Sequence, residues 1–190
     1  MQNSGMASLA MFYYDFREKE KKDLRGLLSS VLFQLCHQSY SYYAILSAFY
    51  STYQNGARSP SNGELIRCLK ELLNLQGQAP VYLIVDALDE CPNTSLPSHR
   101  GQVLGLLEDL VNSKLPNLRI CVTSRPETDI KPILEPLTFR SVSLHDESGQ
   151  KEDIEKYTKS IVNTDIRMRR WSSVHKQLVI DILTERADGM

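Results

Sequence analysis

The chain has 190 residues, of which 42% are hydrophobic and 24% charged, an ordinary composition for a folded domain with a substantial core. Its 22 basic residues nearly balance its 23 acidic ones, which argues against a nucleic-acid partner because phosphate backbones bind a clearly basic face. No apolar run approaches the roughly 18 residues of a membrane-spanning helix, and the opening residues lack the pattern of a secretory signal. We therefore expect neither nucleic acid nor membrane as a partner.

The first half of the chain predicts one strand followed by helices. In chain order we predict a strand over 7–14, helices over 23–36 and 40–53, a loop over 55–60 and a helix from the Ser61–Glu64 capping box through Leu73. The helix over 40–53 carries five tyrosines, at positions 40, 42, 43, 50 and 53. Aromatic side chains at helical spacing favour packing over base stacking, so we expect these tyrosines to pack.

A second strand is the most informative segment of the chain. The unbroken apolar run Val81–Val85 is typical of a strand buried in a parallel sheet. It leads into the carboxylates Asp86, Asp89 and Glu90. Ligands of open α/β sheets bind at the carboxyl ends of the strands, where a carboxylate can hold Mg²⁺ and orient a water against a phosphate. The alternative is a structural strand followed by a solvated acidic turn.

A third strand, over residues 118–122, ends in polar residues and an arginine. Ser124 and Arg125 follow its apolar stretch, and Pro126 closes it because proline cannot donate to a strand ladder. Beside the acidic strand, Arg125 would point into the same crevice, where its planar fork suits a phosphate oxygen. An exposed loop arginine is the alternative.

The remaining elements continue the alternation of strands and helices. We predict a polar loop over 91–100, helices over 103–111 and 128–134, a strand over 139–145, and helices over 150–162 and 174–187. Strands alternating with helices indicate a parallel α/β sheet with right-handed crossovers.

The cysteines and histidines give little support for a metal site. Cys36, Cys68, Cys91 and Cys121 are widely spaced with no C-x-x-C pair, and the four histidines are equally scattered. Cys36 and Cys121 lie within apolar patterns, where a free cysteine behaves as a small hydrophobe. We interpret all four as reduced thiols and expect a cytoplasmic protein.

Several segments together resemble a known family. The stretches LAMFYYDF, LRGLLSSVLFQLC, VYLIVDALDEC, RICVTSRPE and ERADGM resemble the NACHT domain of STAND-type P-loop NTPases, most closely the fungal, nephrocystin-like N-terminal type. The resemblance implies a partial NACHT core over 1–147 with the Walker B and sensor 1 strands, and a helical extension over 148–190. It implies an oligomerisation switch driven by ATP or GTP binding and slow hydrolysis, which self-associates through this domain and binds proteins through repeats outside the chain.

The resemblance also implies roles for the candidate site residues. Asp86 matches the magnesium-associated aspartate, Asp89 and Glu90 the acidic pair credited with water activation, and Arg125, beside Ser124, the sensor arginine. Mg²⁺ with ATP or GTP would be the cofactors of the parent protein.

The main departure from the family is the missing Walker A motif. None of the nine glycines is followed by lysine, so the G-x-x-x-x-G-K-[ST] phosphate loop is absent. We expect a fold that lacks the Walker A strand and its helix, and a chain that binds nucleotide weakly or not at all. A non-catalytic remnant acting as a protein-interaction module is the alternative function.

The missing strand leads to a structural expectation. The resemblance implies that it would lie between the strands at 81–85 and 118–122. We expect these two strands to close up and pair directly, leaving apolar surface that the missing helix would have covered, and poor solubility as a result.

Overall fold

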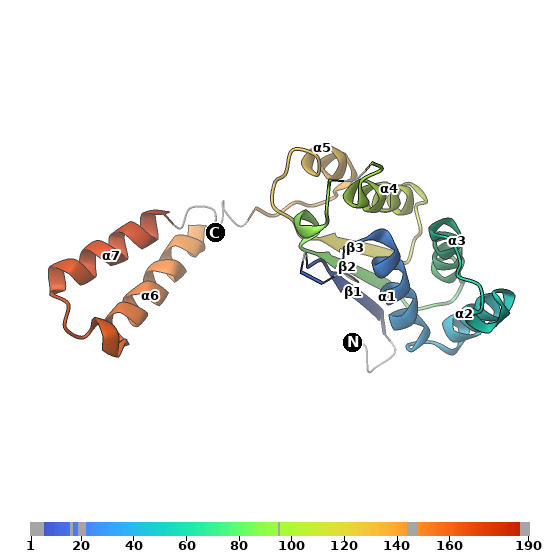
Figure 1. Cartoon of the computed structure of the whole chain (residues 1–190), viewed down its shortest axis with the longest axis horizontal. Helices are drawn as coiled ribbons and strands as arrows, with labels where there is room; N and C mark the ends of the chain where they lie inside the picture. Colours follow the sequence, from blue (N-terminus) through green and yellow to red (C-terminus); the bar gives the residue numbers. More distant parts are fainter. Residues whose placement is uncertain (1–5, 16, 19–21, 95, 144–147, 187–190) are drawn as a thin grey trace. The chain divides into compact units, whose positions relative to one another are not determined.

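The computed structural model describes residues 6–15, 17–18, 22–94, 96–143 and 148–186. The chain divides into two compact units, Met1–Thr138 and Phe139–Met190. Each unit is described by itself below (Figure 1). Every described helix falls short of the length and apolarity needed to cross a membrane.

The first unit is built on a three-stranded parallel sheet. Its strands are β1 (Ser8–Tyr13), β2 (Val81–Asp86) and β3 (Leu118–Val122), in the order β1-β2-β3. Val81 of β2 lies opposite Ser8 on one side and Leu118 on the other. The expected α/β class with a parallel sheet and flanking helices is confirmed. The expected closure is confirmed as well, because β2 and β3 pair directly.

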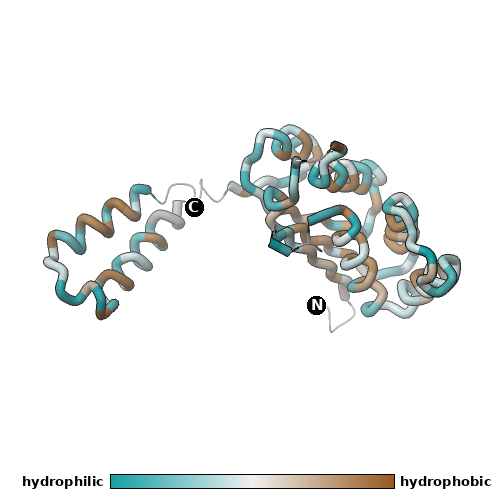
Figure 2. The backbone as a smooth tube through the Cα atoms, in the orientation of Figure 1, coloured by the Kyte–Doolittle hydropathy of each residue, from teal (hydrophilic) through white to brown (hydrophobic). Residues whose placement is uncertain are grey.

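Three helices cover one face of the sheet and form the core with it. They are α1 (Leu24–Cys36), α3 (Asn62–Leu73) and α4 (His99–Asn112). Each begins at a side chain that accepts a backbone N–H: Asp23, Ser61 and Ser98 respectively. The predicted capping box is present, since the Ser61 and Glu64 groups bond reciprocally. Hydrophobic residues recur along the strands and along these helices (Figure 2).

The opposite face of the sheet is bare within the described residues. Side chains alternate along each strand, and those pointing away from the helices are largely exposed, among them Met11, Tyr13, Tyr82, Arg119 and Cys121. A parallel sheet normally has both faces covered. This face therefore exposes apolar side chains, such as Met11 and Tyr82, that a second covering layer would bury.

The helix α2 (Tyr40–Thr52) and the short η3 (Gln54–Gly56) lie outside the sheet layer. The prediction that the tyrosines of this segment pack together is only partly correct. Tyr42 and Tyr53 are buried, whereas Tyr40, Tyr43 and Tyr50 are exposed. A helix that contacts its neighbours along one stripe leaves the aromatic side chains of its other faces in water.

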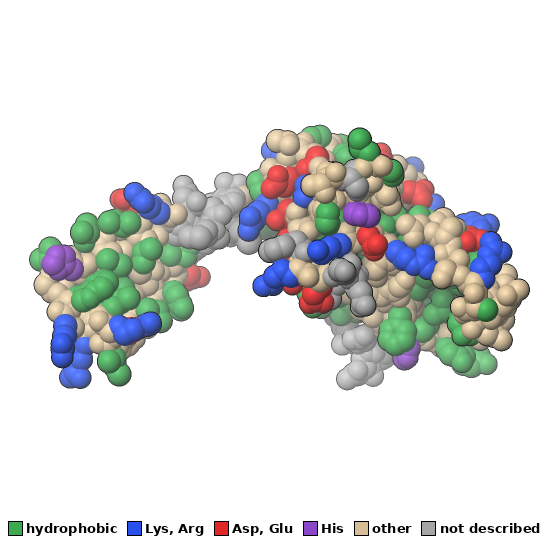
Figure 3. Space-filling model, in the orientation of Figure 1, with side chains coloured by type: hydrophobic (Ala, Val, Ile, Leu, Met, Phe, Trp, Pro, Cys, Tyr) green, Lys and Arg blue, Asp and Glu red, His purple; other side chains and the backbone are tan. Residues whose placement is uncertain are grey.

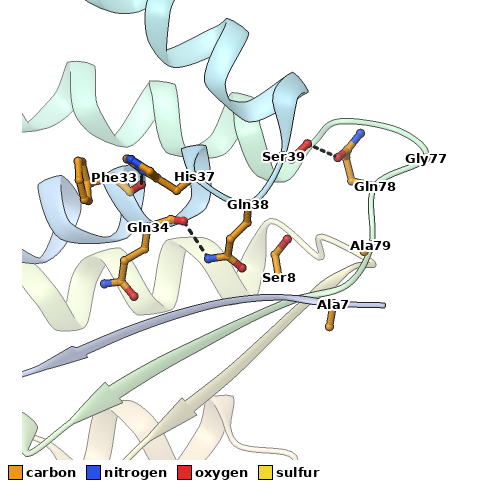
Figure 4. A pocket seen from close by; sticks show the side chains of 10 residues that line it. All are labelled: Ala7, Ser8, Phe33, Gln34, His37, Gln38, Ser39, Gly77, Gln78 and Ala79. Atoms are coloured by element: carbon orange, nitrogen blue, oxygen red, sulfur yellow. Dashed lines mark hydrogen bonds between the residues drawn. The ribbon is translucent and has the colours of Figure 1, made fainter. Parts of the chain in front are cut away.

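The outer edge of β1 is closed by two glutamines, Gln34 of α1 and Gln38 in the turn that follows it. The Gln38 amide accepts from the Leu9 N–H (2.8 Å) and donates to the Leu9 carbonyl (2.7 Å). Gln34 does the same to Met11, at 3.0 and 2.7 Å. We call this pair the glutamine clamp. Both side chains also line a hollow of about 840 Å³ at the start of β1 (Figure 4). By contrast, β3 pairs only with β2 within the described residues.

The short elements after β3 differ from prediction. Residues 128–130 form a turn, and the helix α5 spans only Lys131–Leu134, followed by η5 (Glu135–Leu137). The strand predicted over 139–145 is wrong for residues 139–143, which have no regular structure, and Phe139 and Val142 are exposed. The remainder of that prediction, at residues 144 and 145, lies outside the described residues. An alternating pattern without a neighbouring strand forms no ladder.

The second unit is a helical hairpin. Its helices are α6 (Ser148–Thr164) and α7 (Ser173–Arg186), joined through η7 (Ile166–Met168). Both helices were predicted, with boundaries within two residues of those observed; the last predicted position, residue 187, is not described. The observed division at Thr138 and Phe139 lies upstream of the boundary expected at 147 and 148.

Candidate functional site at the carboxyl edge of the sheet

The predicted site residues meet at one edge of the sheet. β2 and β3 are parallel and paired, so their carboxyl ends lie side by side (Figure 1). Asp86 ends β2, and Asp89 and Glu90 lie in η4 (Leu88–Glu90) directly after it. Ser124 and Arg125 follow β3. We call these five residues the acidic edge.

Asp86 is tied to the end of β3 by Thr123. The Thr123 hydroxyl donates to the exposed Asp86 carboxylate. The same hydroxyl oxygen accepts from the Ala87 N–H at 3.0 Å, and the Thr123 carbonyl accepts from the Leu88 N–H at 3.0 Å. One threonine therefore fastens the two strand ends together and fixes the aspartate between them.

A left-handed residue shapes the turn after Asp86. Ala87 has φ 53° and ψ 47°, a conformation that costs a non-glycine residue about 1–2 kcal/mol. The turn sends Leu88 into the core, where it is fully buried, and leaves Asp89 facing the end of β3. The strain is offset by the bonds from Ala87 and Leu88 to Thr123.

Asp89 holds Arg125 in two ways. Its carboxylate accepts the Arg125 backbone N–H at 3.1 Å, and its second oxygen lies 3.5 Å from the guanidinium Nε. The Asp89 side chain is 14% exposed and that of Arg125 is 83% exposed. The Ser124 hydroxyl donates to the Arg125 carbonyl at 2.7 Å. The arginine is thus anchored at its backbone while its head group reaches into solvent.

Arg100, at the start of α4, braces the loop behind the acidic edge. It donates to the Asp89 carbonyl (2.6 Å) and the Cys91 carbonyl (2.9 Å), and its Nη1 donates to both carboxylate oxygens of Asp129 (3.0 and 3.1 Å). Its side chain is only 11% exposed. Asn93 also donates to Asp129, at 2.7 Å. The brace joins the segment after β2 to the segment after β3.

Tyr14 and Cys91 are buried beneath this edge. The Tyr14 hydroxyl has no well-oriented hydrogen bond to any described group, and the Cys91 thiol donates to the Lys22 carbonyl at 3.4 Å. Burial raises the pKa of both groups, that of Cys91 to about 12. Both stay protonated at neutral pH, so neither can act as a base or nucleophile there.

Glu90 faces the segment that follows β1. It is half-buried. The Asp15 carboxylate is the main cause of the raised pKa of Arg17, and the charge of Glu90 adds to it. Across the described residues, no three His, Cys, Asp or Glu side chains converge to hold a metal ion. The acidic edge offers carboxylate oxygens, the ligand type that hard cations prefer.

Sequence reasoning missed Arg100 and Asp129. Both lie in polar stretches, where a charged residue ordinarily faces solvent, and neither belongs to a recognisable motif. The one available signal was an arginine close behind the acidic triplet, in the loop predicted over 91–100. All four cysteines are free, as expected, but Cys121 is exposed rather than buried.

Comparison with known families identifies the family to which the chain belongs. Residues 1–125, about two thirds of the 190, match the family described as Nephrocystin 3, N-terminal. The chain belongs to this family. The nephrocystin 3 N-terminal match spans β1, β2 and β3 and ends at Arg125, so it contains the whole acidic edge. No curated protein and no solved structure matches the chain.

Proposed function

We propose that this chain supplies the magnesium-associated and arginine-bearing half of a nucleoside triphosphate site in a NACHT-type signalling NTPase. In this proposal, nucleotide binding controls self-association of the parent protein, and slow hydrolysis resets it. The observation that carries the proposal is the meeting of Asp86, Asp89 and Arg125 at the carboxyl edge of a parallel sheet, the usual ligand position in α/β folds.

The acidic edge fits a magnesium ion in part. Mg²⁺ takes oxygen ligands and keeps several of its waters, so one or two protein oxygens suffice beside a phosphate. Asp86 offers an exposed carboxylate, and Thr123 offers a hydroxyl already directed at it. These two residues would hold the ion, which would neutralise phosphate charge during transfer.

Arg125 fits a terminal phosphate. Its guanidinium is mostly exposed, yet its backbone is fixed by Asp89. A phosphate oxygen would compete with the Asp89 carboxylate for the guanidinium. Released from the arginine, Asp89 together with Glu90 would be positioned to orient a water molecule.

The chain does not supply the loop that makes most contacts to phosphate in P-loop proteins. A phosphate loop needs backbone amides and a lysine, and no glycine of this chain precedes a lysine. The glutamine clamp closes the outer edge of β1, whereas β3 has no second strand partner among the described residues. Because β2 and β3 pair directly, no strand can lie between them as the resemblance implied. In our proposal, a further strand bearing the phosphate loop would instead add at the free edge of β3, beside Arg125.

A second function is favoured by a specific observation. The acidic groups already have partners: Thr123 donates to Asp86, and Arg125 pairs with Asp89. Such contacts also suit a purely structural turn in a module that binds proteins and no nucleotide.

Two titrations of the intact chain separate these functions. We expect isothermal titration with Mg·ATP and Mg·GTP to show no micromolar affinity, since the phosphate-binding loop is missing. Mn²⁺, as a paramagnetic substitute for Mg²⁺, should broaden NMR signals around Asp86, Thr123 and Arg125 at millimolar concentration.

The control is Asp86→Asn, which should abolish the broadening at that edge while leaving the fold intact. Micromolar affinity for ATP would contradict the proposal that this chain supplies only half of a nucleotide site. Absence of selective broadening at the acidic edge would favour the interaction module.

A further inference from the structure

The turn that joins α6 to α7 is rich in basic residues and poor in acidic ones. Between Asp165 and Asp181 the sequence contains no carboxylate side chain, but it carries Arg167, Arg169, Arg170 and Lys176. Basic side chains gather at this end of the hairpin on the face visible in Figure 3. The turn therefore presents local positive charge on a chain whose net charge is only -1.

Two of these arginines are available to a binding partner. Arg167 pairs with the Asp165 carboxylate at 2.7 Å. Arg169 and Arg170 are exposed, and neither forms an ion pair within the described part of the chain. Their guanidinium groups can therefore bind carboxylates of another protein at no cost to an existing contact.

Ser172 follows the two arginines at the start of α7. It is exposed and lies outside regular structure. Its hydroxyl oxygen accepts the His175 N–H at 3.3 Å and lies 3.0 Å from His175 Nδ1, and its carbonyl accepts the Lys176 N–H at 3.0 Å. Since His175 is exposed as well, another protein can reach the Ser172 hydroxyl without opening a buried core.

We infer that Ser172 is a phosphorylation site for a serine kinase that selects basic substrates. Kinases distinguish substrates by their charge pattern. Carboxylates in the substrate groove of such a kinase would pair with Arg169 and Arg170, three and two positions before the serine, and guanidinium groups form these pairs with good geometry.

The reaction is an ordinary phosphoryl transfer from ATP. The Ser172 Oγ forms a bond to the γ-phosphorus, and the bond between that phosphorus and the oxygen bridging it to the β-phosphorus breaks. ADP leaves, and the serine proton passes to the catalytic aspartate of the kinase. The inference does not depend on nucleotide binding by this chain, because it uses no residue of the acidic edge.

The sequence offers no other site with the same charge pattern. Arg169 and Arg170 are the only adjacent arginines in the chain. Four other hydroxyl residues have an arginine three positions before them, but none has a second arginine two positions before: Ser61, Thr128, Ser143 and Ser173. Thr128 is also flanked by Glu127 and Asp129, which would repel an acidic groove.

A phosphate on Ser172 would stabilise the start of α7. A phosphoserine carries a charge of about -1.5 to -2 at neutral pH. The N–H groups at a helix N-terminus favour such an anion, and Ser172 already occupies the capping position through its bond to the His175 N–H. Phosphorylation thus replaces a neutral cap with a charged one.

Phosphorylation of the full chain in vitro tests the site. The probe is the catalytic subunit of cAMP-dependent protein kinase with Mg·ATP, followed by mass spectrometry of the intact chain and of its peptides. We expect a gain of about 80 Da, the mass of one phosphate, located on Ser172. Ser172→Ala should abolish the gain, whereas the matched control Ser173→Ala should leave it unchanged.

Removal of the two arginines tests their role. Arg169→Gln with Arg170→Gln should lower kcat/KM for phosphorylation of Ser172 by about 100-fold, because both charged pairs with the kinase are lost. The control Arg167→Gln with Lys176→Gln removes the same charge from the turn and should have little effect. Circular dichroism reports whether each variant keeps its helix content.

Hydrogen exchange tests the effect on α7. After phosphorylation, the amides of Val174 and His175 should exchange about fivefold more slowly, as a favourable charge at a helix N-terminus predicts. Unchanged exchange at these two amides would overturn the capping role of the phosphate.

Three outcomes would overturn the site itself. The first is an intact chain that is not phosphorylated under conditions in which a peptide of residues 166–178 is. The second is a phosphate located on Ser61, Thr128, Ser143 or Ser173 instead of Ser172. The third is an Arg169 and Arg170 double variant that keeps its helices and is phosphorylated as fast as wild type.

Discussion

Arg100 holds the loop behind the acidic edge in place. It contacts two backbone carbonyls of the loop after β2 and the Asp129 carboxylate beyond β3, and it is almost fully buried. We expect Arg100→Met to lower the free energy of unfolding by about 2–3 kcal/mol, because hydrogen bonds that involve a charged group are each worth about 1.5–3 kcal/mol. Urea denaturation measures this change.

Two further variants make the Arg100 prediction specific. Arg100→Lys should recover little of the loss, since one ammonium cannot reproduce the planar fork of the guanidinium. Arg119→Met is the control: Arg119 is exposed and donates only to nearby carbonyls of its own segment. Equal losses from the Arg100 and Arg119 substitutions would show that the brace has no special role.

At the scale of the elements, the glutamine clamp controls the edge of β1. Gln34→Ala with Gln38→Ala would expose four backbone groups of Leu9 and Met11 that are now bonded. We expect a loss of about 1 kcal/mol of stability per glutamine and the appearance of species larger than the wild-type assembly, because open strand edges pair with other chains. Sedimentation velocity detects these species.

Gln78→Ala is a suitable control for the clamp. Gln78 lines the same hollow but accepts from Ser39 rather than binding the strand (Figure 4). If the clamp variant sedimented like this control, the edge of β1 would be protected by something other than the two glutamines.

The start of α3 gives the first unit a defined response to acid. Hydrogen bonds to the Glu64 carboxylate, first from the Tyr53 hydroxyl and then from the Ser61 backbone and hydroxyl, lower its pKa from 4.5 to about 2. A lowered folded pKa stabilises the fold above the unfolded pKa, and this contribution is lost as the pH falls. The stability advantage of wild type over Glu64→Gln should therefore be full above pH 5 and should vanish near pH 2.

Urea denaturation at several pH values measures that advantage. Glu71→Gln on the same helix is the control for removal of a charge, since Glu71 is exposed. An advantage that stayed constant from pH 6 to pH 3 would contradict the role of the capping box.

At the scale of the whole molecule, the junction between the two units is open to proteases. Residues 139–143 are exposed and have no regular structure, and such backbone is cut first. We expect brief trypsin treatment to cleave after Arg140 before any site within the helices, as mass spectrometry of the fragments would show. Arg140→Gln should remove this early cut. Faster cleavage after Lys156 or Arg169 would mean that the hairpin is not stably folded.

The sequence was sufficient to predict the sheet and the location of the candidate site. The apolar run of β2 and the polar residues after β3 are local patterns, and parallel pairing necessarily brings their ends together. Contacts made by residues distant in sequence could not be predicted. Gln34 looks like a solvent-facing position of an amphipathic helix and Gln38 like a position in the turn after it. Only the folded chain places the open edge of a strand beside them.

The failures of prediction have a similar origin. Residues 139–143 alternate as a strand does, but a strand exists only where a neighbour accepts its hydrogen bonds. The tyrosines of α2 have helical spacing, yet which of them are buried depends on where α1 and α3 meet that helix. The acidic edge was predictable because its residues are fixed by the ends of two strands rather than by remote packing.

The glutamine clamp also sets a limit on how many sheets can join through their strands. In the language of polymer chemistry, a unit with two reactive ends grows into a chain, whereas a unit with one reactive end stops after a single coupling. With the β1 side occupied by Gln34 and Gln38, the sheet is monofunctional: β3 can accept one strand, and the product offers no site for the next. Two amide side chains, one on α1 and one in the turn after it, thereby act as a chain terminator against fibrous growth.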